Sequence, residues 1–508
     1  MTRLLRLFTD AGERGYRIAT AAAALMAGAV VPLAFAPYGW WWFALLGLAV
    51  LFRLWLDCGP RRAAWLGWLF GVGMWGGGVY WIYHSLHYFG DAIAPLAILF
   101  TIAFALAMAL TLAVLGALVA RGPTRQRGVG WLLVLAPVAW VALEWVRSWL
   151  FTGFPWLLLG TSQIDTPLAG LAPLFGVYGV GLAVAFSAGV MAALPRLRGA
   201  GLAAAVAGVV VIWGSGLLLD GRDWNEAEGE PLRAGLVQGN VAQDEKFDSV
   251  RRSVELYAGM TREIAADTDL VIWPETAVPT FWDRVEPELN ELAVDLDDTD
   301  VVTGIFTRDL ATGHYFNSIR PLGPERDVYS KQRLVPFGEY LPLRDWLTFL
   351  DRVIQIPMSD LVLPPEPQGS IRAGGVRIGA FVCYEAAYPG VVRDLARESG
   401  LLVNVSNDAW FGDSAAPAQH LEIARMRALE NGLPMLRATN TGISAIIDHH
   451  GAIIARSPQF EAATLVREVQ PRTGDTPYNR LGDVPVLILL GLVIAGWLLR
   501  RRLVRLAR

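Results

Sequence analysis

The stretch Val376-Arg-Ile-Gly-Ala-Phe-Val-Cys383-Tyr-Glu385 places a cysteine directly behind a short apolar run. A run of this length and composition is typical of a buried strand. Similar runs recur between residues 220 and 480 and alternate with helical stretches, and this alternation predicts a layered α/β fold. The expected strands are Leu232–Gln238, Leu270–Trp273, Val301–Ile305, Val376–Val382, Leu401–Val405 and Ile443–Asp448, and the expected helices include Asp248–Ala266 and Gln419–Asn431.

Polar side chains follow three of these expected strands. Glu275 comes just after the second strand, Cys383 directly after the fourth, and residues 404–408 close the fifth. In open α/β sheets, functional sites lie in the crevice beyond the carboxyl ends of the strands. We therefore expect these side chains to converge on one site.

The residues around Cys383 supply what a reactive cysteine needs. A cysteine attacks as a thiolate, yet with an ordinary pKa of about 8.5 only a few per cent is ionised near neutral pH. Glu275 can accept the thiol proton, and Lys331 can stabilise negative charge on the thiolate and on a tetrahedral oxyanion. Glu339, eight residues after Lys331, can orient that lysine. Taken singly, each residue also fits a structural role, because a cysteine that ends a strand is often inert packing.

The overall composition indicates that part of the chain lies in lipid. Hydrophobic residues make up 54% of the 508 residues and charged residues only 18%. A water-soluble chain of this composition would expose large apolar patches. The net charge of -4 gives no basic footprint for nucleic acid. Two cysteines, Cys58 and Cys383, predict neither a disulfide framework nor a Cys-x-x-Cys metal cluster.

Long apolar runs divide the chain into membrane and soluble parts. Each run is close to the roughly 20 residues that a helix needs to cross about 30 Å of hydrocarbon. We expect a transmembrane bundle over 1–219, a soluble catalytic domain over 220–483, and a last transmembrane helix with a basic tail over 484–508. The eight expected spans lie near 18–36, 40–56, 63–83, 92–119, 131–150, 168–194, 200–219 and 484–499.

Arginine placement predicts the orientation, because short cytoplasmic loops collect Lys and Arg. The basic segments fall in every second loop, so both termini are expected in the cytoplasm and the soluble domain outside, on the periplasmic face of the inner membrane in a Gram-negative cell. The first run resembles a signal peptide, but a second apolar run follows without a polar mature domain. The basic segments are the N-terminus, Arg61-Arg62, Arg121 with Arg125 and Arg127, Arg196 with Arg198, and the tail from Arg500.

Four ordered motifs around these residues resemble the Glu-Lys-Cys signature of the nitrilase superfamily. They are Trp273-Pro-Glu275, Tyr329-Ser-Lys331 with Pro336-Phe-Gly-Glu339, Val382-Cys-Tyr-Glu385, and Asn404-Val-Ser-Asn-Asp-Ala-Trp410. The membrane part adds Phe35-Ala-Pro37, Trp81-Ile-Tyr83, Glu144-Trp-Val-Arg147 and Thr152-Gly-Phe-Pro-Trp156. Together these motifs cover nearly the whole chain, which resembles the apolipoprotein N-acyltransferases, the membrane-embedded branch of that superfamily.

The resemblance implies an αββα sandwich for the soluble domain and a specific reaction. Enzymes of this family move an acyl chain from a phospholipid, usually phosphatidylethanolamine, through a thioester to the α-amino group of the diacylglyceryl-modified N-terminal cysteine of a lipoprotein. The covalent intermediate lets the phospholipid remnant leave before the acceptor arrives. The resemblance assigns Glu275 as general base, Lys331 as oxyanion stabiliser and Cys383 as nucleophile. It adds Glu339, Tyr384 and Glu385 as residues that support these three. It implies no metal or cofactor, and we expect the enzyme to be a monomer.

Substrate contacts are expected at two aromatic residues and one apolar segment. Phe247 stands where we expect a tryptophan in relatives, so an aromatic contact is kept without an indole N–H, and Trp410 lies in the fourth motif. Residues 346–365 are more apolar than a solvated loop, and either pack on the domain core or form an arm that dips into the outer leaflet. An acyl chain needs such an apolar path, because exposure to water costs about 0.8 kcal/mol per CH₂. The candidates here are Leu350, Val353 and Ile354.

Three other interpretations remain open from the sequence. A membrane-tethered nitrilase or amidase would use the same residues on a small amide, with water as the acceptor. A Cys-His hydrolase would need His314 or His420 as the partner of Cys383. A transporter or scaffold would explain the apolar helices but would leave the ordered Glu, Lys and Cys motifs unexplained.

Overall fold

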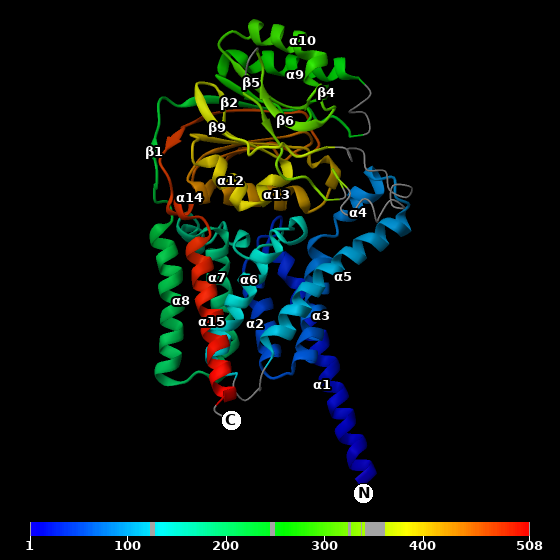
Figure 1. Ribbon diagram of the computed structural model, residues 1–508, viewed down its shortest axis with the longest axis vertical. Helices are drawn as coiled ribbons and strands as arrows, with labels where there is room; N and C mark the ends of the chain where they lie inside the picture. The colour runs from blue at the N-terminus through cyan, green and yellow to red at the C-terminus, as the bar shows by residue number, and fades with distance from the viewer. Residues whose placement is uncertain are drawn as a thin grey trace.

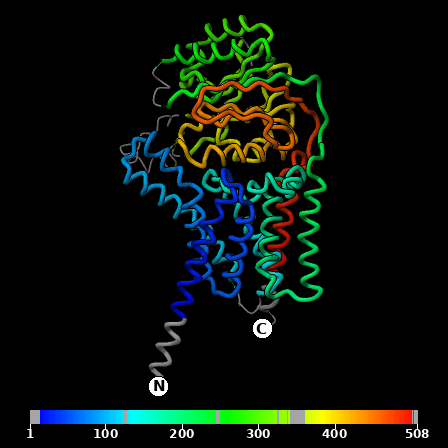
Figure 2. The backbone as a smooth tube through the Cα atoms, turned by 180° about the vertical axis from the view of Figure 1, so that it is seen from behind, coloured from blue at the N-terminus to red at the C-terminus, as the bar shows by residue number. Residues whose placement is uncertain are grey.

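A helical bundle carries a two-sheet domain on one of its ends in the computed structural model, which describes residues 2–121, 127–243, 249–323, 327–336, 338–340 and 361–506. Figure 1 shows the bundle below, the sheets above, and both chain termini at the end of the bundle that is farthest from the sheets. The same stacking is visible from behind in Figure 2.

Every apolar run that was expected to span a membrane forms helix. Within the described residues, four stretches are long and apolar enough to cross a membrane, namely Glu13–Ala34, Ala94–Val119, Pro167–Arg196 and Gly199–Leu219, and Trp42–Leu56 and Val484–Arg500 are shorter apolar helices. The helices are α1 (Thr2–Val30), α2 (Trp42–Leu56), α3 (Pro60–Gly78), α4 (Ile82–His84), α5 (Ala94–Val119), α6 (Ala136–Arg147), α7 (Ala172–Ala193), α8 (Gly199–Leu219) and α15 (Val484–Leu506).

Small residues let the bundle helices approach closely, while their outer faces stay apolar. A Cβ atom at Gly67 of α3 would lie 2.4 Å from the Leu112 carbonyl oxygen of α5, so only glycine fits there. Such contacts are typical of helices that pack in lipid. On the outside, Val210 and Leu218 of α8 are 63% and 85% exposed. Apolar side chains in such positions are favourable against lipid and unfavourable against water.

The upper domain is a sandwich of two sheets between two pairs of helices. Figure 1 shows α9 (Val250–Ile264) and α10 (Trp282–Asp295) over one sheet, and α12 (Pro389–Ala396) and α13 (Ala416–Asn431) under the other. The first sheet has the order β14 (Ala463–Val469), β2 (Leu232–Gln238), β3 (Leu270–Ile272), β5 (Asp300–Arg308), β6 (Tyr315–Pro321), β7 (Tyr329–Ser330), with β4 (Val278–Phe281) beside β5. The second has the order β13 (Ile453–Arg456), β12 (Ala445–Ile447), β11 (Met435–Thr439), β10 (Leu401–Ser406), β9 (Val376–Val382), β8 (Ile371–Ala373).

The expected strands are confirmed, two of them residue for residue. Leu232–Gln238 and Val376–Val382 are β2 and β9, and the last expected strand shortens to Ala445–Ile447. In each sheet three neighbouring strands are parallel, β2-β3-β5 and β9-β10-β11, so their carboxyl ends meet at one edge. The register pairs Val382 with Val405, which brings Cys383 and Ser406 out of neighbouring strands at the same level.

The helix α13 joins the sandwich to the bundle. It is buried along nearly its whole length, and four of its polar side chains bond to bundle residues. The contacts are Ala36 N to Glu422 Oε1 (3.1 Å), Val177 N to Glu430 Oε1 (2.6 Å), Trp156 Nε1 to Gln419 Oε1 (2.7 Å) and Arg425 to Asp165 (2.5 Å). Buried polar groups need such partners, so this interface fixes the sandwich on the bundle.

Candidate active site

The structure brings Glu275, Lys331 and Cys383 to the strand ends between the two sheets. Glu275 follows β3 through Trp273 and Pro274, and Lys331 directly follows β7. Cys383 ends β9 and begins the short 3-10 helix η11 (Cys383–Ala387). All three side chains are nearly buried, with residue exposures of 6%, 1% and 8%.

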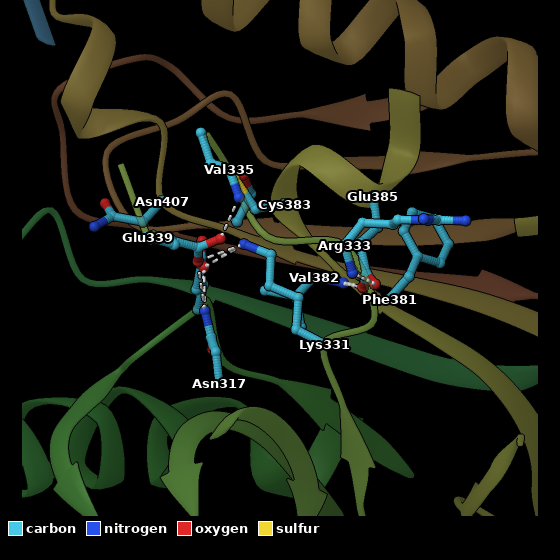
Figure 3. Close-up of polar contacts among 12 residues, drawn as sticks. Asn317, Lys331, Arg333, Val335, Glu339, Phe381, Val382, Cys383, Glu385 and Asn407 are labelled. Atoms are coloured by element: carbon cyan, nitrogen blue, oxygen red, sulfur yellow. Dashed lines mark hydrogen bonds and ion pairs between the residues drawn. The ribbon is translucent and has the colours of Figure 1, made fainter. Parts of the chain in front are cut away.

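Lys331 is held between two carboxylates. Its Nζ lies 2.7 Å from Glu339 Oε1 and 3.6 Å from Glu275 Oε1. Figure 3 shows the Lys331 ammonium turned toward the Glu339 carboxylate. Burial acts to lower the pKa of Lys331, but the charges of Glu339 and Glu275 outweigh it and raise that pKa above its ordinary value. Lys331 is therefore a fixed cation beside Cys383.

Asn317, which the sequence did not single out, orients the two carboxylates. Its Nδ2 donates to Glu275 Oε1 at 2.7 Å and to Glu339 Oε1 at 3.4 Å, while its backbone oxygen accepts from Lys331 N at 2.8 Å. Val335 N donates to the other oxygen of Glu339 at 2.8 Å. An asparagine inside a strand gives no sequence signal of this kind, because its role depends on which residues lie across the sheet.

Cys383 is strained and, at rest, protonated. Its φ angle of +51° lies in the left-handed region, which is uncommon for non-glycine residues and costs energy. Burial raises the pKa of the Cys383 thiol well above its ordinary value, Glu275 raises this pKa further, and Lys331 lowers it. The thiol therefore keeps its proton until a base removes it, and Glu275 is the carboxylate whose charge acts on it most strongly.

Glu385 links the residues around Lys331 to the turn that contains Cys383, which we call the cysteine turn. It is fully buried and accepts hydrogen bonds from Gln332 N (2.6 Å), Arg333 N (3.1 Å), Val382 N (2.8 Å) and Tyr329 OH (2.9 Å). Figure 3 shows its carboxylate reaching Arg333 and Val382. Burial raises the pKa of Glu385 to about 7 against these hydrogen bonds. Its place in the network is to hold the turn in which Cys383 lies.

Tyr384 points from the cysteine turn to the bundle. Its ring stacks on Phe154 and Trp156 with centroids 6.4 Å apart in both cases, and its hydroxyl donates to the Gly153 carbonyl at 3.4 Å. Tyr388 OH donates to the same carbonyl at 3.2 Å. The turn that contains Cys383 thus adjoins the loop that follows α6. That loop carries three exposed apolar side chains, Trp149 (52%), Leu150 (44%) and Phe151 (92%).

The predicted substrate contacts are only partly placed. Trp410 lies in η12 (Asp408–Phe411) against the segment after α4, where its ring packs edge-on to Phe89 (5.4 Å) and its carbonyl accepts from Ser85 Oγ (2.8 Å). Trp410 is thus at the contact between sandwich and bundle. Phe247, Leu350, Val353 and Ile354 lie outside the described residues.

The two histidines weighed as partners of Cys383 lie in different places. His314 is exposed on the turn between β5 and β6. His420 is 1% exposed and adjoins Cys383, but its Nε2 lies 3.0 Å from the Cys383 carbonyl oxygen. That nitrogen is thus engaged with the backbone, which does not match the base of a Cys-His hydrolase.

Two groups of side chains in the described ranges have the spacing for a metal ion, Asp223 with His449 and His450, and Cys383 with Asp408 and His420. In each group a histidine nitrogen lies within hydrogen-bond distance of the aspartate. His449 Nε2 is 2.6 Å from Asp223 Oδ1, and His420 Nδ1 is 3.0 Å from Asp408 Oδ1.

A two-sheet sandwich whose strand ends gather a glutamate, a lysine and a cysteine defines a carbon-nitrogen hydrolase domain, here joined to an apolar helical bundle. The family model for carbon-nitrogen hydrolases matches residues 233–478, and that for the apolipoprotein N-acyltransferase N-terminal domain matches residues 27–190. The chain belongs to the apolipoprotein N-acyltransferase family, the acyltransferases of the nitrilase superfamily.

Relatives match over almost the full length. The chain is 43% identical to the apolipoprotein N-acyltransferase of Pseudomonas paraeruginosa over 490 residues, 94% of this chain and 96% of the relative. It is 44% identical to that of Azotobacter vinelandii over 498 residues, 95% of this chain and 96% of the relative. Among solved structures, a carbon-nitrogen hydrolase from Helicobacter pylori G27 overlaps 47% of this chain and 90% of its own, with a TM-score of 0.38 and 16% identity.

Proposed function

We propose that this acyltransferase moves a fatty acyl chain from a phospholipid, through a thioester on Cys383, to the α-amino group of the N-terminal diacylglyceryl-cysteine of lipoproteins. The observation that carries the proposal is the position of Cys383, beside Lys331 and Glu275 and in a turn that adjoins the bundle loop that Tyr384 contacts. Phosphatidylethanolamine is the proposed donor, and the enzyme works as a monomer. The reaction is the final step of lipoprotein maturation.

The first half-reaction forms the thioester. Glu275 takes the thiol proton while the sulfur attacks the ester carbonyl carbon of the phospholipid. The carbonyl oxygen becomes an oxyanion, which the Lys331 ammonium stabilises. When the oxyanion collapses, the bond to the glycerol oxygen breaks, and Glu275 returns its proton to that oxygen. A lysophospholipid leaves and the acyl chain stays on Cys383.

The second half-reaction transfers the chain to the lipoprotein. The neutral α-amino group attacks the thioester carbon, and Lys331 again stabilises the oxyanion. Glu275 takes a proton from the attacking nitrogen, the carbon–sulfur bond breaks, and the sulfur regains a proton from Glu275. The products are an amide and the free Cys383 thiol. Asn317 and Glu339 hold Glu275 and Lys331 in place through both steps.

A short apolar path supports delivery from the membrane. Tyr384 and Tyr388 bond to the carbonyl oxygens of residues 152 and 153, and the preceding residues 149–151 expose large apolar side chains. A loop of this composition is favourable in the outer leaflet, since burying apolar area contributes about 25 cal/mol per Å². An acyl chain can therefore reach the cysteine turn without crossing water.

The proposed topology has eight spans, with the sandwich on the periplasmic face of the inner membrane. Three of the basic loops meet at the end of the bundle opposite the sandwich. There Arg196 Nη2 lies 3.1 Å from Asp57, and Arg127 Nη1 donates to the Cys58 carbonyl at 2.7 Å. Both termini lie at this same end (Figure 1). Clustered arginines favour the cytoplasmic side.

Single cysteines in a Cys58→Ala/Cys383→Ala background test this topology. Glu398 of the sandwich and Arg61 in the first turn of α3 are both exposed. A membrane-impermeant maleimide added outside should label Glu398→Cys, and should label Arg61→Cys only after the inner membrane is permeabilised. Labelling in the reverse order would place the sandwich in the cytoplasm and exclude this function.

A two-stage incubation tests the reaction itself. Purified protein receives phospholipid with a labelled acyl chain, the phospholipid is removed, and a diacylglyceryl-cysteine peptide is added. We expect hydroxylamine-sensitive label on the protein after the first stage and amide-linked label on the peptide after the second, because a covalent intermediate separates the two substrates. Hydrolysis of a small amide without any lipid product would instead support the amidase interpretation.

A further inference from the structure

His420 on α13 has both ring nitrogens engaged with oxygen atoms. Nδ1 lies 3.0 Å from Asp408 Oδ1, and Nε2 lies 3.0 Å from the backbone oxygen of Cys383. A carbonyl oxygen and an ionised carboxylate accept hydrogen bonds and donate none, and a neutral imidazole has only one N–H. Both contacts are therefore hydrogen bonds only when the ring is an imidazolium.

Asp408 is ionised in this setting. An arginine cation and a hydroxyl donor bond to its carboxylate oxygens, and hydrogen bonds of this kind favour the charged form of a carboxyl group. Arg437 Nη2 lies 2.6 Å from Asp408 Oδ2, and Ser406 Oγ donates to Asp408 Oδ1 at 2.8 Å. Asp408, His420 and Arg437 are at most 1% exposed. One buried carboxylate thus lies between two buried cations, and the group carries a net positive charge.

The carbonyl that His420 holds belongs to the peptide between Cys383 and Tyr384. In a trans peptide the C=O and the N–H point in opposite directions, so Tyr384 N–H points away from His420. Cys383 begins η11, and the first N–H groups of a helix have no carbonyl partner within it. A cation on the C=O polarises the peptide and makes its N–H a stronger donor. The imidazole ring also lies near the thiol, because Cys383 Sγ, a carboxylate oxygen of Asp408 and a ring nitrogen of His420 are within 4.8 Å of one another.

We infer that His420 is a positioning residue that works as a permanent imidazolium: it holds and polarises the Cys383–Tyr384 peptide, so that Tyr384 N–H joins Lys331 in stabilising the oxyanion. The inference rests on the proposed acyl transfer, in which a negative oxygen forms twice above Cys383. His420 moves no proton in either half-reaction. Its part is to keep a fixed positive charge behind the cysteine turn.

The charged groups that face His420 make a pH test specific. They are Asp408 from η12, Arg437 from β11 through Asp408, and Cys383 from η11, while from the bundle the neutral Trp156 ring lies 5.8 Å from the imidazole. Asp408→Asn removes the charge that keeps His420 protonated. The rate of thioester formation by Asp408→Asn should then fall as pH rises through neutrality. Neither the wild type nor the double variant Asp408→Asn/His420→Gln should show this fall. Superimposable pH profiles for the wild type and Asp408→Asn would contradict the inference.

His420→Gln tests the charge with little change of shape. Glutamine keeps an N–H for the Cys383 carbonyl but has no charge, so thioester formation should fall about 10- to 100-fold. The matched control is His449→Gln, which removes a hydrogen-bonded histidine from the Asp223 contact at the domain surface and should leave the rate unchanged. A His420→Gln rate within about twofold of the wild type would reject the imidazolium role. If the wild type itself forms no Cys383 thioester, it is the proposed function that fails.

Nitrogen NMR of histidine-labelled wild-type protein reads the charge of His420 directly in the unaltered site. The chain has 6 histidines. We expect the His420 ring to show two protonated nitrogens at pH 8. Its signals are assigned by their loss in His420→Gln, or by substituting the other five histidines in turn. A His420 signal with one unprotonated nitrogen would overturn the inference, and a merely structural histidine would give that result.

Discussion

Cys383→Ala should form no acyl-enzyme when it is incubated with labelled phospholipid, and its transfer of acyl chains to a diacylglyceryl peptide should fall by at least about 10⁴-fold. Losses of this size follow removal of a nucleophile on which all other groups act. The Cys383 side chain is small and 8% exposed, so alanine replaces it with little loss of packing. The measurement is hydroxylamine-sensitive label on the protein after the first stage, followed by single-turnover transfer.

Cys58→Ala is the matched control for this prediction. Cys58 is the other free cysteine and lies in the α2–α3 loop near Arg127, at the end of the bundle opposite the sandwich. It should label and transfer like the wild type. Label that persists on Cys383→Ala would show that another residue carries the acyl chain, and the ping-pong scheme through Cys383 would then be wrong.

Removal of the Lys331 charge should slow thioester formation by about 10²- to 10³-fold, the loss typical of an oxyanion-stabilising donor. Lys331→Met alone is a poor test, because it leaves Glu339 and Glu275 as buried carboxylates without their cation. Breaking one side of a buried ion pair destabilises proteins by about 3–5 kcal/mol. Lys331→Met/Glu339→Gln removes one positive and one negative charge together, and should recover most of the lost thermal stability.

The comparison that isolates Lys331 is therefore the double variant against Glu339→Gln. Both proteins should fold, as judged by thermal unfolding and by slow alkylation of the buried Cys383 thiol. Only in the double variant should the single-turnover rate of acylation by phospholipid fall, by about 10²- to 10³-fold. Equal acylation rates in the two proteins would mean that Lys331 balances Glu339 and takes no part in the reaction.

The strands and the residues that follow them could be predicted because their signals are local. A short apolar run ended by a polar residue marks a strand and its carboxyl end, and this is how Glu275 and Cys383 were found. The eight apolar runs predicted helices for the same reason, and helix forms at each of them. Lys331 was found through its motif and its chemistry, since β7 before it is only two residues long.

The contacts between distant segments could not be predicted in this way. Asn317 bonds to Glu275 across 42 residues and to Glu339 across 22, and nothing near Asn317 in the chain indicates either contact. His420 was considered only as a partner for the thiol, whereas the structure places its Nε2 on the carbonyl of Cys383. The atom that the His420 ring contacts depends on how α13 packs under the sheet, and the hydrophobic periodicity of the sequence does not encode that packing.

By itself the sequence determined the fold class, the division into apolar and polar parts, and the residue types that perform the chemistry. Hydrophobic burial and side-chain reactivity are properties of short segments, and so the sequence expresses them directly. Only the tertiary structure decided that Lys331 lies between two carboxylates, that Cys383 has a left-handed backbone, and that its turn adjoins the bundle. Sheet order, strand register and helix seating set these relations, because each depends on the packing of segments far apart in the chain.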